Sequence, residues 1–240
     1  MAATLGSLEK IGIFVVGGLV RLGIFLAVLA AIAVPLVVIA WAINRVRARR
    51  RRAMGLHEVS GVTVRPGVRY APGHTWLLRR GEGTLEIGMD DLALRLLPAV
   101  TAVEAVRTGT RVKRGETIVT LWGGGRQLPI RAPFDARISG VNSAVVRDPS
   151  LVRSDGYGKG WLVALEPANE QWSALPSDAA ADGWMAAEAR RWNQQLERSL
   201  GIAAADGGEL ITPAPWLLGE DRWSELAAAF TDPGVTGGSE

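Results

Sequence analysis

A long apolar run stands near the start of the chain. Residues 22–43 carry no charged side chain, and as a helix at 1.5 Å per residue they extend for about 33 Å. The hydrocarbon core of a bilayer is about 30 Å thick, whereas a helix of this length in a soluble core would carry a polar stripe. The pattern therefore predicts a transmembrane helix over residues 22–44, with Pro35 tolerated inside it as a kink.

Charged residues flank this run on both sides. A second apolar stretch, residues 8–20, ends at Arg21, so residues 1–21 either lie at the membrane surface or extend the spanning helix. The six arginines of residues 45–52 follow the run, whereas a signal peptide carries its positive charge before a shorter apolar stretch. We therefore expect an uncleaved, single-pass anchor in a bacterial cytoplasmic (inner) membrane. The positive-inside rule places the N-terminus outside and the C-terminal domain in the cytoplasm.

The middle of the chain follows a different pattern. Past a basic juxtamembrane linker, residues 45–66, short apolar runs alternate with glycine and proline, which is typical of a small β-sandwich or barrel. A helical insertion over residues 90–97 interrupts the series. Glycine permits the positive φ of a tight turn, so strands 118–122 and 128–132 are expected to pair across Gly123-Gly124-Gly125. The predicted strands are 75–79, 83–87, 100–105, 118–122, 128–132, 136–141 and 161–165.

Helical periodicity returns in a C-terminal extension, residues 169–240. Residues 178–200 predict a helix on which Trp184, Trp192, Leu196 and Leu200 share a face, and residues 220–230 predict a shorter one. A linker containing Gly207-Gly208 separates them, and residues 231–240 resemble a flexible tail. Two such helices cannot bury themselves alone, so they either fold onto the β-domain or clasp a partner. The five tryptophans beyond residue 169 fit core packing or an interface equally well.

Composition and charge exclude several classes of protein. The chain has no cysteine and two histidines among 240 residues, which excludes disulfides, thiolate chemistry and multi-histidine metal sites. The net charge of +3 is uneven, because the arginines form one block while residues 169–240 are acidic. This block does not spread over a folded face, so we expect no nucleic-acid partner. It either fixes membrane orientation alone or also attracts anionic lipid, through Arg45, Arg47, Arg49, Arg50, Arg51 and Arg52.

Several motifs between residues 70 and 165 occur together in one order. They are His74-x-Trp76, Ile87-Gly88-Met89, Ala93 followed by Leu96, Val112 with Gly115, Ala132-Pro133, Val141-Asn142 and a segment 148–162 that contains Tyr157-Gly158-Lys159-Gly160-Trp161. This order resembles the glycine cleavage system H-protein. The resemblance covers residues 67–168 and implies a mainly β fold, the barrel-sandwich hybrid of lipoyl domains. That fold consists of two small antiparallel sheets with flanking helices.

The chain departs from this family at its functional residue. The family carries a lipoylated lysine at the tip of the hairpin, and the resemblance places Gly125 or Arg126 there. The three lysines of the chain, Lys10, Lys113 and Lys159, lie elsewhere. The family's Pro-x-x-Gly after the hairpin is also replaced, by Pro133-Phe134-Asp135-Ala136. We therefore expect no lipoate and no other cofactor.

Other candidate residues have simpler structural interpretations. His74 is expected to pack or cap a turn, and Asp90 or Asp91 to cap the 90–97 helix rather than bind a metal. Asp148 and Asp155 are expected to satisfy backbone donors in a loop. Gly123-Gly124-Gly125-Arg126 lacks the Gly-Lys-Ser/Thr ending of a phosphate loop. We expect no catalytic, cofactor-binding or metal-ligating residue, and hence no enzyme.

These patterns favour a non-catalytic, single-pass accessory subunit of a larger cytoplasmic-membrane complex. The H-protein-like domain would cap the cytoplasmic face, and the helix would contact integral subunits through small residues such as Gly17, Gly18, Gly23 and Ala30. The architecture suggests an energy-transducing host, respiratory or photosynthetic, and thus a link to electron transport. The first alternative is a membrane-tethered carrier or docking protein for lipoate-dependent metabolism. The second is an efflux-type membrane-fusion adaptor, a class with a long helical hairpin between its lipoyl-like half-motifs.

Overall fold

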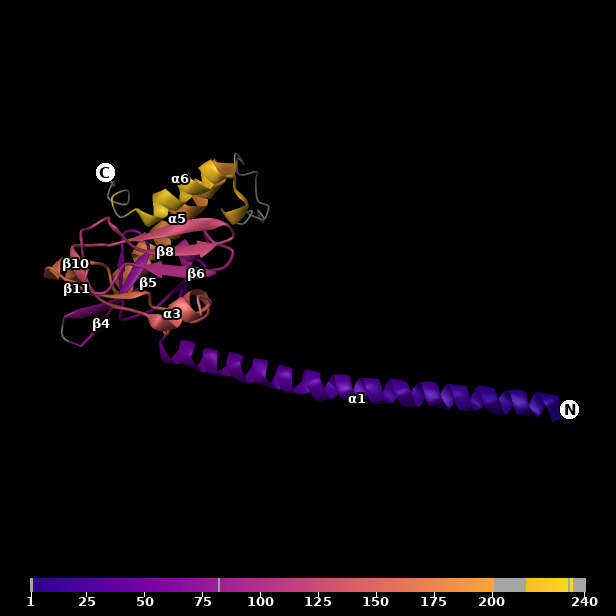
Figure 1. Cartoon of the computed structure of the whole chain (residues 1–240). Coiled ribbons are helices and arrows are strands. Elements are labelled where there is room, and N and C mark those ends of the chain that lie inside the picture. Colours follow the sequence, from indigo (N-terminus) through magenta and orange to yellow (C-terminus); the bar gives the residue numbers. More distant parts are fainter. Residues whose placement is uncertain (1, 82, 201–214, 233, 235–240) are drawn as a thin grey trace. The chain divides into compact units, whose positions relative to one another are not determined.

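The chain forms two separate units. The structure, a computed structural model, describes residues 2–81, 83–200, 215–232 and 234. The first unit comprises Met1–Ala53 and the second Met54–Glu240. The predicted Gly207-Gly208 linker and nearly all of the predicted tail lie outside the described residues. Figure 1 shows the chain with its elements labelled.

The first unit is a single helix, α1, Ala2–Ala53. Residues 8–20 therefore belong to the same continuous helix as the apolar run. Pro35 lies inside the helix without ending it. Within the described residues, Ile24–Ala53 is the one helical segment long and apolar enough to cross a membrane, by length and composition alone.

The described residues of the second unit form three antiparallel sheets. A six-stranded sheet has the order β3-β4-β5-β11-β10-β7, a three-stranded sheet the order β6-β8-β9, and β1 pairs with β2. The strands are β1 His57–Val59, β2 Val62–Val64, β3 Arg69–Ala71, β4 Thr75–Arg80, β5 Thr84–Met89, β6 Ala102–Ala105, β7 Arg111–Val112, β8 Thr117–Gly123, β9 Arg126–Arg131, β10 Ala136–Val141 and β11 Val163–Pro167. The predicted β-sheet domain of small antiparallel sheets is confirmed.

Five helices complete the described part of the unit. They are α2 Asp91–Leu94, α3 Ser143–Arg147, α4 Leu151–Ser154, α5 Asp178–Leu200 and α6 Glu220–Thr231, with 3₁₀ turns η1 Glu170–Ala174 and η2 Pro215–Leu217. Asp90 caps α2 by accepting a hydrogen bond from the Ala93 amide at 3.0 Å, as expected. Asn142 caps α3 in the same way through the Ala144 amide.

The predicted linker 45–66 differs from the structure. Its first part is the end of α1, and its second part holds the β1–β2 hairpin. The physical reason is the alternation Val62-Thr63-Val64 after Gly61, which has a φ of 74° suited to a turn. Val62 and Val64 are buried in the core of the second unit. The folded domain therefore begins about ten residues earlier than the sequence pattern indicated.

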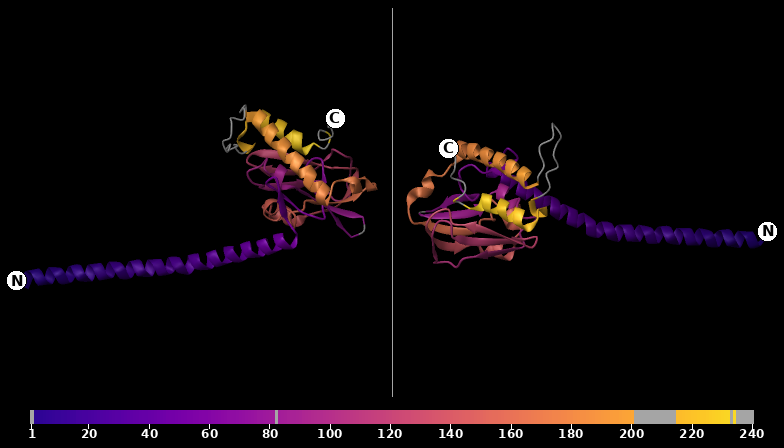
Figure 2. Two further views of the ribbon diagram at one scale, coloured as in Figure 1. Left: turned by 180° about the vertical axis from the view of Figure 1, so that it is seen from behind. Right: turned by 90° about the horizontal axis from the view of Figure 1, so that it is seen from above.

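The C-terminal helices belong to the same core as the sheets. Ala181, Met185, Ala189, Trp192 and Leu196 recur every three to four residues along α5 and are all buried. On α6, Trp223, Leu226, Ala227 and Phe230 are buried in the same way. Figures 1 and 2 show α5 and α6 side by side over the β-structure. Of the two alternatives for these helices, the structure selects packing on the β-domain.

Candidate functional site

The hairpin tip between β8 and β9 is the first place to look for function. The register pairs Trp122 with Gln127 and Gly123 with Arg126, which leaves Gly124 and Gly125 as a two-residue turn. Their φ angles are 60° and 78°, the combination that a type I′ hairpin turn requires and that glycine adopts without strain. The predicted hairpin is confirmed, and its tip carries no side chain beyond hydrogen.

The space around the tip differs from one glycine to the next. A Cβ on Gly123 would lie 1.8 Å from the Ala99 carbonyl oxygen, and one on Gly124 would lie 2.6 Å from Pro98 Cγ. A Cβ on Gly125 would meet no heavy atom within 4 Å. The segment Pro98–Ala99 thus closes one side of the tip, and of the three glycines only Gly125 has room for a side chain.

Arg126 attaches the tip to the C-terminal extension. Its guanidinium carbon lies 4.8 Å from the centre of the Trp223 ring, and its Nη2 donates to the Leu218 carbonyl. The Trp223 indole nitrogen in turn donates to the Leu96 carbonyl oxygen at 2.8 Å. The tip, the segment after α2 and the start of α6 therefore form one packed cluster.

Both lysines of the β-domain lie away from this tip. Lys113 follows β7 in a turn that its own amide closes by donating to Glu116 Oε2 at 2.9 Å. Lys159 lies in the loop after α4, where its amide donates to Asp155 Oδ2 at 3.2 Å. Neither residue belongs to β8, β9 or the turn between them.

A second cluster of chemically interesting side chains surrounds His74. His74 is fully buried, and its Nδ1 lies 2.7 Å from Asp90 Oδ2 while its Nε2 lies 3.3 Å from Glu188 Oε2. Glu188 also accepts a hydrogen bond from Arg191 Nη1 at 2.7 Å. The rings of Trp184 and Phe230 flank the imidazole, with centroids at 5.2 and 5.4 Å. The cluster thus joins the β3–β4 turn to α5 and α6.

The charges of this cluster shift the pKa values of its members. Burial by itself lowers the pKa of His74, but the charge and hydrogen bond of Asp90, with those of Glu188, outweigh it and raise the pKa to about 9. Burial raises the pKa of Glu188, yet His74 and Arg191 lower it below its usual value overall. At neutral pH His74 is therefore a buried cation between two carboxylates, and Arg191 balances the second of them.

This arrangement suits fold stabilisation rather than catalysis. Both imidazole nitrogens already have carboxylate partners, and the ring has no exposed surface, so it offers neither a free lone pair nor a route for a substrate. Among the described residues, no three histidine, aspartate or glutamate side chains are placed to hold a metal ion. The sequence pattern predicted packing for His74 but did not identify Glu188 and Arg191 as its partners.

The loop residues Asp148 and Asp155 take the roles expected of them, as acceptors for backbone amides. Asp148 Oδ1 accepts from the Ser150 amide at 3.2 Å and its hydroxyl at 2.6 Å, and Asp155 accepts from the Lys159 amide. Asp91 lies 3.5 Å from Arg95 across one turn of α2. Trp192 and Trp223 lie in the core, whereas Trp172, Trp184 and Trp216 are half-buried. Core packing thus accounts for two of the five C-terminal tryptophans.

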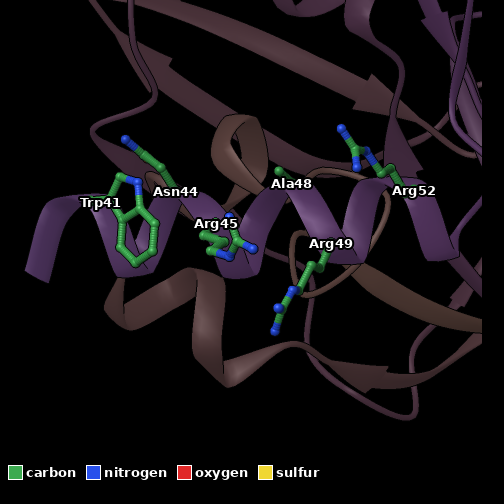
Figure 3. Close-up of a pocket in the computed structure, with 6 residues that line it drawn as sticks. All are labelled: Trp41, Asn44, Arg45, Ala48, Arg49 and Arg52. Atoms are coloured by element: carbon green, nitrogen blue, oxygen red, sulfur yellow. The ribbon is translucent and has the colours of Figure 1, made fainter.

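The basic end of α1 is a third candidate. Trp41, Asn44, Arg45, Ala48, Arg49 and Arg52 line a shallow pocket on this helix (Figure 3). Their spacing of three and four residues places them on one helical face. The guanidinium carbon of Arg45 lies 5.3 Å from the centre of the Trp41 ring, which is cation–π distance.

Comparison with known proteins identifies the β-domain. The family model described as "Glycine cleavage H-protein" matches residues 68–188. The glycine cleavage system H protein of Mycolicibacterium vanbaalenii is 35% identical over 118 residues, which cover 49% of this chain and 90% of that protein. A probable glycine cleavage system H protein 2 of Sulfurisphaera tokodaii is 34% identical over 107 residues, which cover 44% of this chain and 72% of that protein.

A solved structure is similar over about half of the chain. The crystal structure of a glycine cleavage system H protein from Mycobacterium marinum has a TM-score of 0.43 and 24% sequence identity, covering 51% of this chain and 98% of that one. The family match ends within α5, and both α1 and α6 lie outside it.

Proposed function

The chain belongs to the glycine cleavage H-protein family, and from that premise we propose that it has lost lipoyl transfer and serves as a membrane-anchored, non-catalytic accessory subunit of a cytoplasmic-membrane complex. The observation that carries this proposal is the hairpin tip. The turn consists of Gly124 and Gly125, and neither strand that leads into it contains a lysine. A lipoyl group requires a primary amine, and glycine and arginine provide none for it.

The contacts of Arg126 support the loss of the carrier function. A lipoyl arm has to move between partner enzymes, so the residue that carries it must have a free side chain. Here the residue after the turn contacts Leu218 and Trp223, so it helps to hold α6 on the β-domain. The hairpin has thus become part of the packing of the C-terminal extension.

Helix α1 supports the membrane part of the proposal. Its apolar segment is long enough to span a bilayer and is followed by arginines, which favour an N-terminus outside and a domain in the cytoplasm. The large apolar side chains described on this segment are exposed to solvent and would contact lipid or integral subunits. We propose an energy-transducing host, respiratory or photosynthetic, on grounds of architecture alone.

A membrane-tethered lipoate carrier is the alternative that the family relationship favours. It requires lipoate on Lys113 or Lys159, because these are the two lysines of the domain. The efflux-adaptor alternative requires a long helical hairpin between β8 and β9. A two-residue turn stands there instead, which counts against that alternative.

A lipoylation assay tests the proposal directly. The full chain is co-expressed with a lipoate ligase and its intact mass is measured, with the Mycolicibacterium vanbaalenii H protein as the positive control. We expect a lipoyl adduct on the control and none on this chain. An adduct that disappears in Lys113→Arg or Lys159→Arg would establish the carrier alternative.

A pull-down tests the accessory role. The tagged chain is solubilised in mild detergent from its native membrane, and co-purifying proteins are identified by mass spectrometry. We expect integral membrane subunits in fixed stoichiometry. A chain that elutes alone as a monomer under several detergents would refute the accessory role.

A further inference from the structure

The pocket on α1 combines charge, an aromatic ring and a small residue on one helical face. Trp41, Arg45, Ala48, Arg49 and Arg52 recur at intervals of three and four residues, so these positions lie on one face of the helix. In Figure 3, Trp41 and Arg45 lie beside each other, while Arg49 and Arg52 lie further along the helix and point in different directions. Ala48, with only a methyl group, leaves a hollow between the arginines.

The charge on this face has no acidic residue near it along the helix. Between Glu9 and Glu58 the sequence contains no aspartate or glutamate. Arg45 contacts the Trp41 ring at 5.3 Å, which keeps its guanidinium over an apolar surface while leaving its donors available. Guanidinium groups match phosphate oxygens in geometry and charge better than other cationic side chains do.

The position of the pocket along the helix specifies what kind of anion fits. Trp41 stands at the end of the apolar run, where tryptophan prefers the level of lipid headgroups. On its N-terminal side lie exposed apolar residues such as Val34, Val37 and Val38. A molecule with an anionic head at Arg45 and Arg49 and hydrocarbon tails along this apolar surface would match both the basic pocket and the apolar residues before it.

We propose that Trp41, Arg45, Ala48, Arg49 and Arg52 form a binding site for one anionic phospholipid, with its phosphate held by the arginines and its acyl chains along α1. This site rests on the proposed membrane anchoring. It is a selective, stoichiometric site on one helical face, which differs from diffuse attraction of the whole arginine block to a charged leaflet.

Charge-matched double variants separate a site from diffuse attraction. Arg45→Gln with Arg49→Gln removes two charges from the pocket face. Arg47→Gln with Arg50→Gln removes two charges from positions roughly 200° and 140° around the helix from Arg45. Diffuse attraction weakens equally in both, by about fivefold per arginine. A site on one face is lost in the first variant only.

A second pair of variants changes the pocket without changing charge. Ala48→Leu fills the hollow between the arginines, whereas Ala40→Leu adds the same bulk about 220° around the helix from Arg45. We expect Ala48→Leu to weaken lipid retention about tenfold or more and Ala40→Leu to leave it unchanged. Equal retention in these two variants would show that the hollow is not the binding site.

Native mass spectrometry provides the readout. The full chain is reconstituted in phosphatidylcholine nanodiscs containing a minor fraction of phosphatidylglycerol, then released into detergent, and retained lipids are counted. The wild type and the Arg47/Arg50 variant are expected to retain one phosphatidylglycerol, and the Arg45/Arg49 variant none. Equal loss in both double variants, or equal retention of phosphatidylcholine, would overturn the proposal.

Two further measurements identify the source of any failure. Inorganic phosphate in the release buffer is expected not to displace the lipid, and displacement at moderate concentrations would identify a free-phosphate site instead. Alkaline carbonate extraction of membranes is expected to leave every variant in the pellet. A chain that is extracted as a soluble protein would refute the membrane anchoring itself, whereas a pelleted chain without retained lipid would refute only the lipid site.

Discussion

The buried His74 should make the stability of the β-domain fall as the pH rises above neutral. In the unfolded chain a histidine loses its proton near pH 6.5, whereas the pKa of His74 in the folded protein is about 9. The folded state therefore holds a proton that the unfolded state releases between these values. The stabilisation is complete below about pH 6.5 and is lost as the pH rises through about 9.

The size of this effect follows from the pKa difference. A rise from 6.5 to about 9 corresponds to about 3 kcal/mol of unfolding free energy, at roughly 1.4 kcal/mol per pKa unit. Glu188 has the opposite dependence, because its pKa is lowered: its contribution is present above its ordinary value and is lost as the pH falls. The cluster therefore stabilises the fold most in mildly acidic solution, and this stabilisation is lost at both lower and higher pH.

Chemical denaturation of the full chain in detergent, followed by tryptophan fluorescence between about pH 6 and pH 10, measures this dependence. The control is His74→Asn, because asparagine tolerates the φ of 57° at this position and its amide still donates to Asp90. We expect the variant to be less stable at pH 6 and to lose most of the decline at higher pH. A wild type whose stability is constant over this range, or a variant with the same decline, would refute a protonated His74.

Three further predictions concern packing. A Cβ on Gly88 would lie 2.3 Å from Trp76, so Gly88→Ala should lower the unfolding free energy by at least about 1–3 kcal/mol. The matched control Gly140→Ala should lower it less, because the nearest atom to a Cβ there lies at 3.8 Å. Gly124→Ala should destabilise more than Gly125→Ala, because both have positive φ but only Gly124 meets Pro98. Trp223→Ala should lower the unfolding free energy by about 3–5 kcal/mol and make α6 accessible to limited proteolysis. If α6 stayed protected in that variant, Trp223 would not be the main anchor of the helix. Thermal and chemical unfolding of each matched pair checks the first two.

Local signals in the sequence were sufficient for most of the secondary structure. The predicted helix 178–200 coincides with α5, and the predicted strand 136–141 coincides with β10. The β8–β9 hairpin was predictable because three glycines between two apolar runs leave few other conformations. These elements depend on neighbours in sequence, which is why periodicity and turn residues identify them.

Contacts between distant residues were not predictable in the same way. His74 and Glu188 are 114 positions apart in the sequence. The local pattern around Glu188 indicates only a polar residue on an amphipathic helix. Only the fold brings its carboxylate to the imidazole. The β1–β2 hairpin was missed for a related reason, since two three-residue strands carry too little periodicity to stand out from a linker.

The position of the remaining apolar surface bears on where a partner can bind. The apolar faces of α5 and α6 lie in the core of the β-domain, so these faces are not available to clasp a neighbouring subunit. Among the described residues, every exposed large apolar side chain other than Val146 and Leu217 belongs to α1. Of the described surface, α1 is therefore the part best suited to association through apolar contact, with lipid or with integral subunits. For this reason we expect that replacing α1 by an unrelated transmembrane helix abolishes complex assembly while the β-domain stays folded. Assembly that survives this exchange would place the partner surface on the polar exterior of the domain instead.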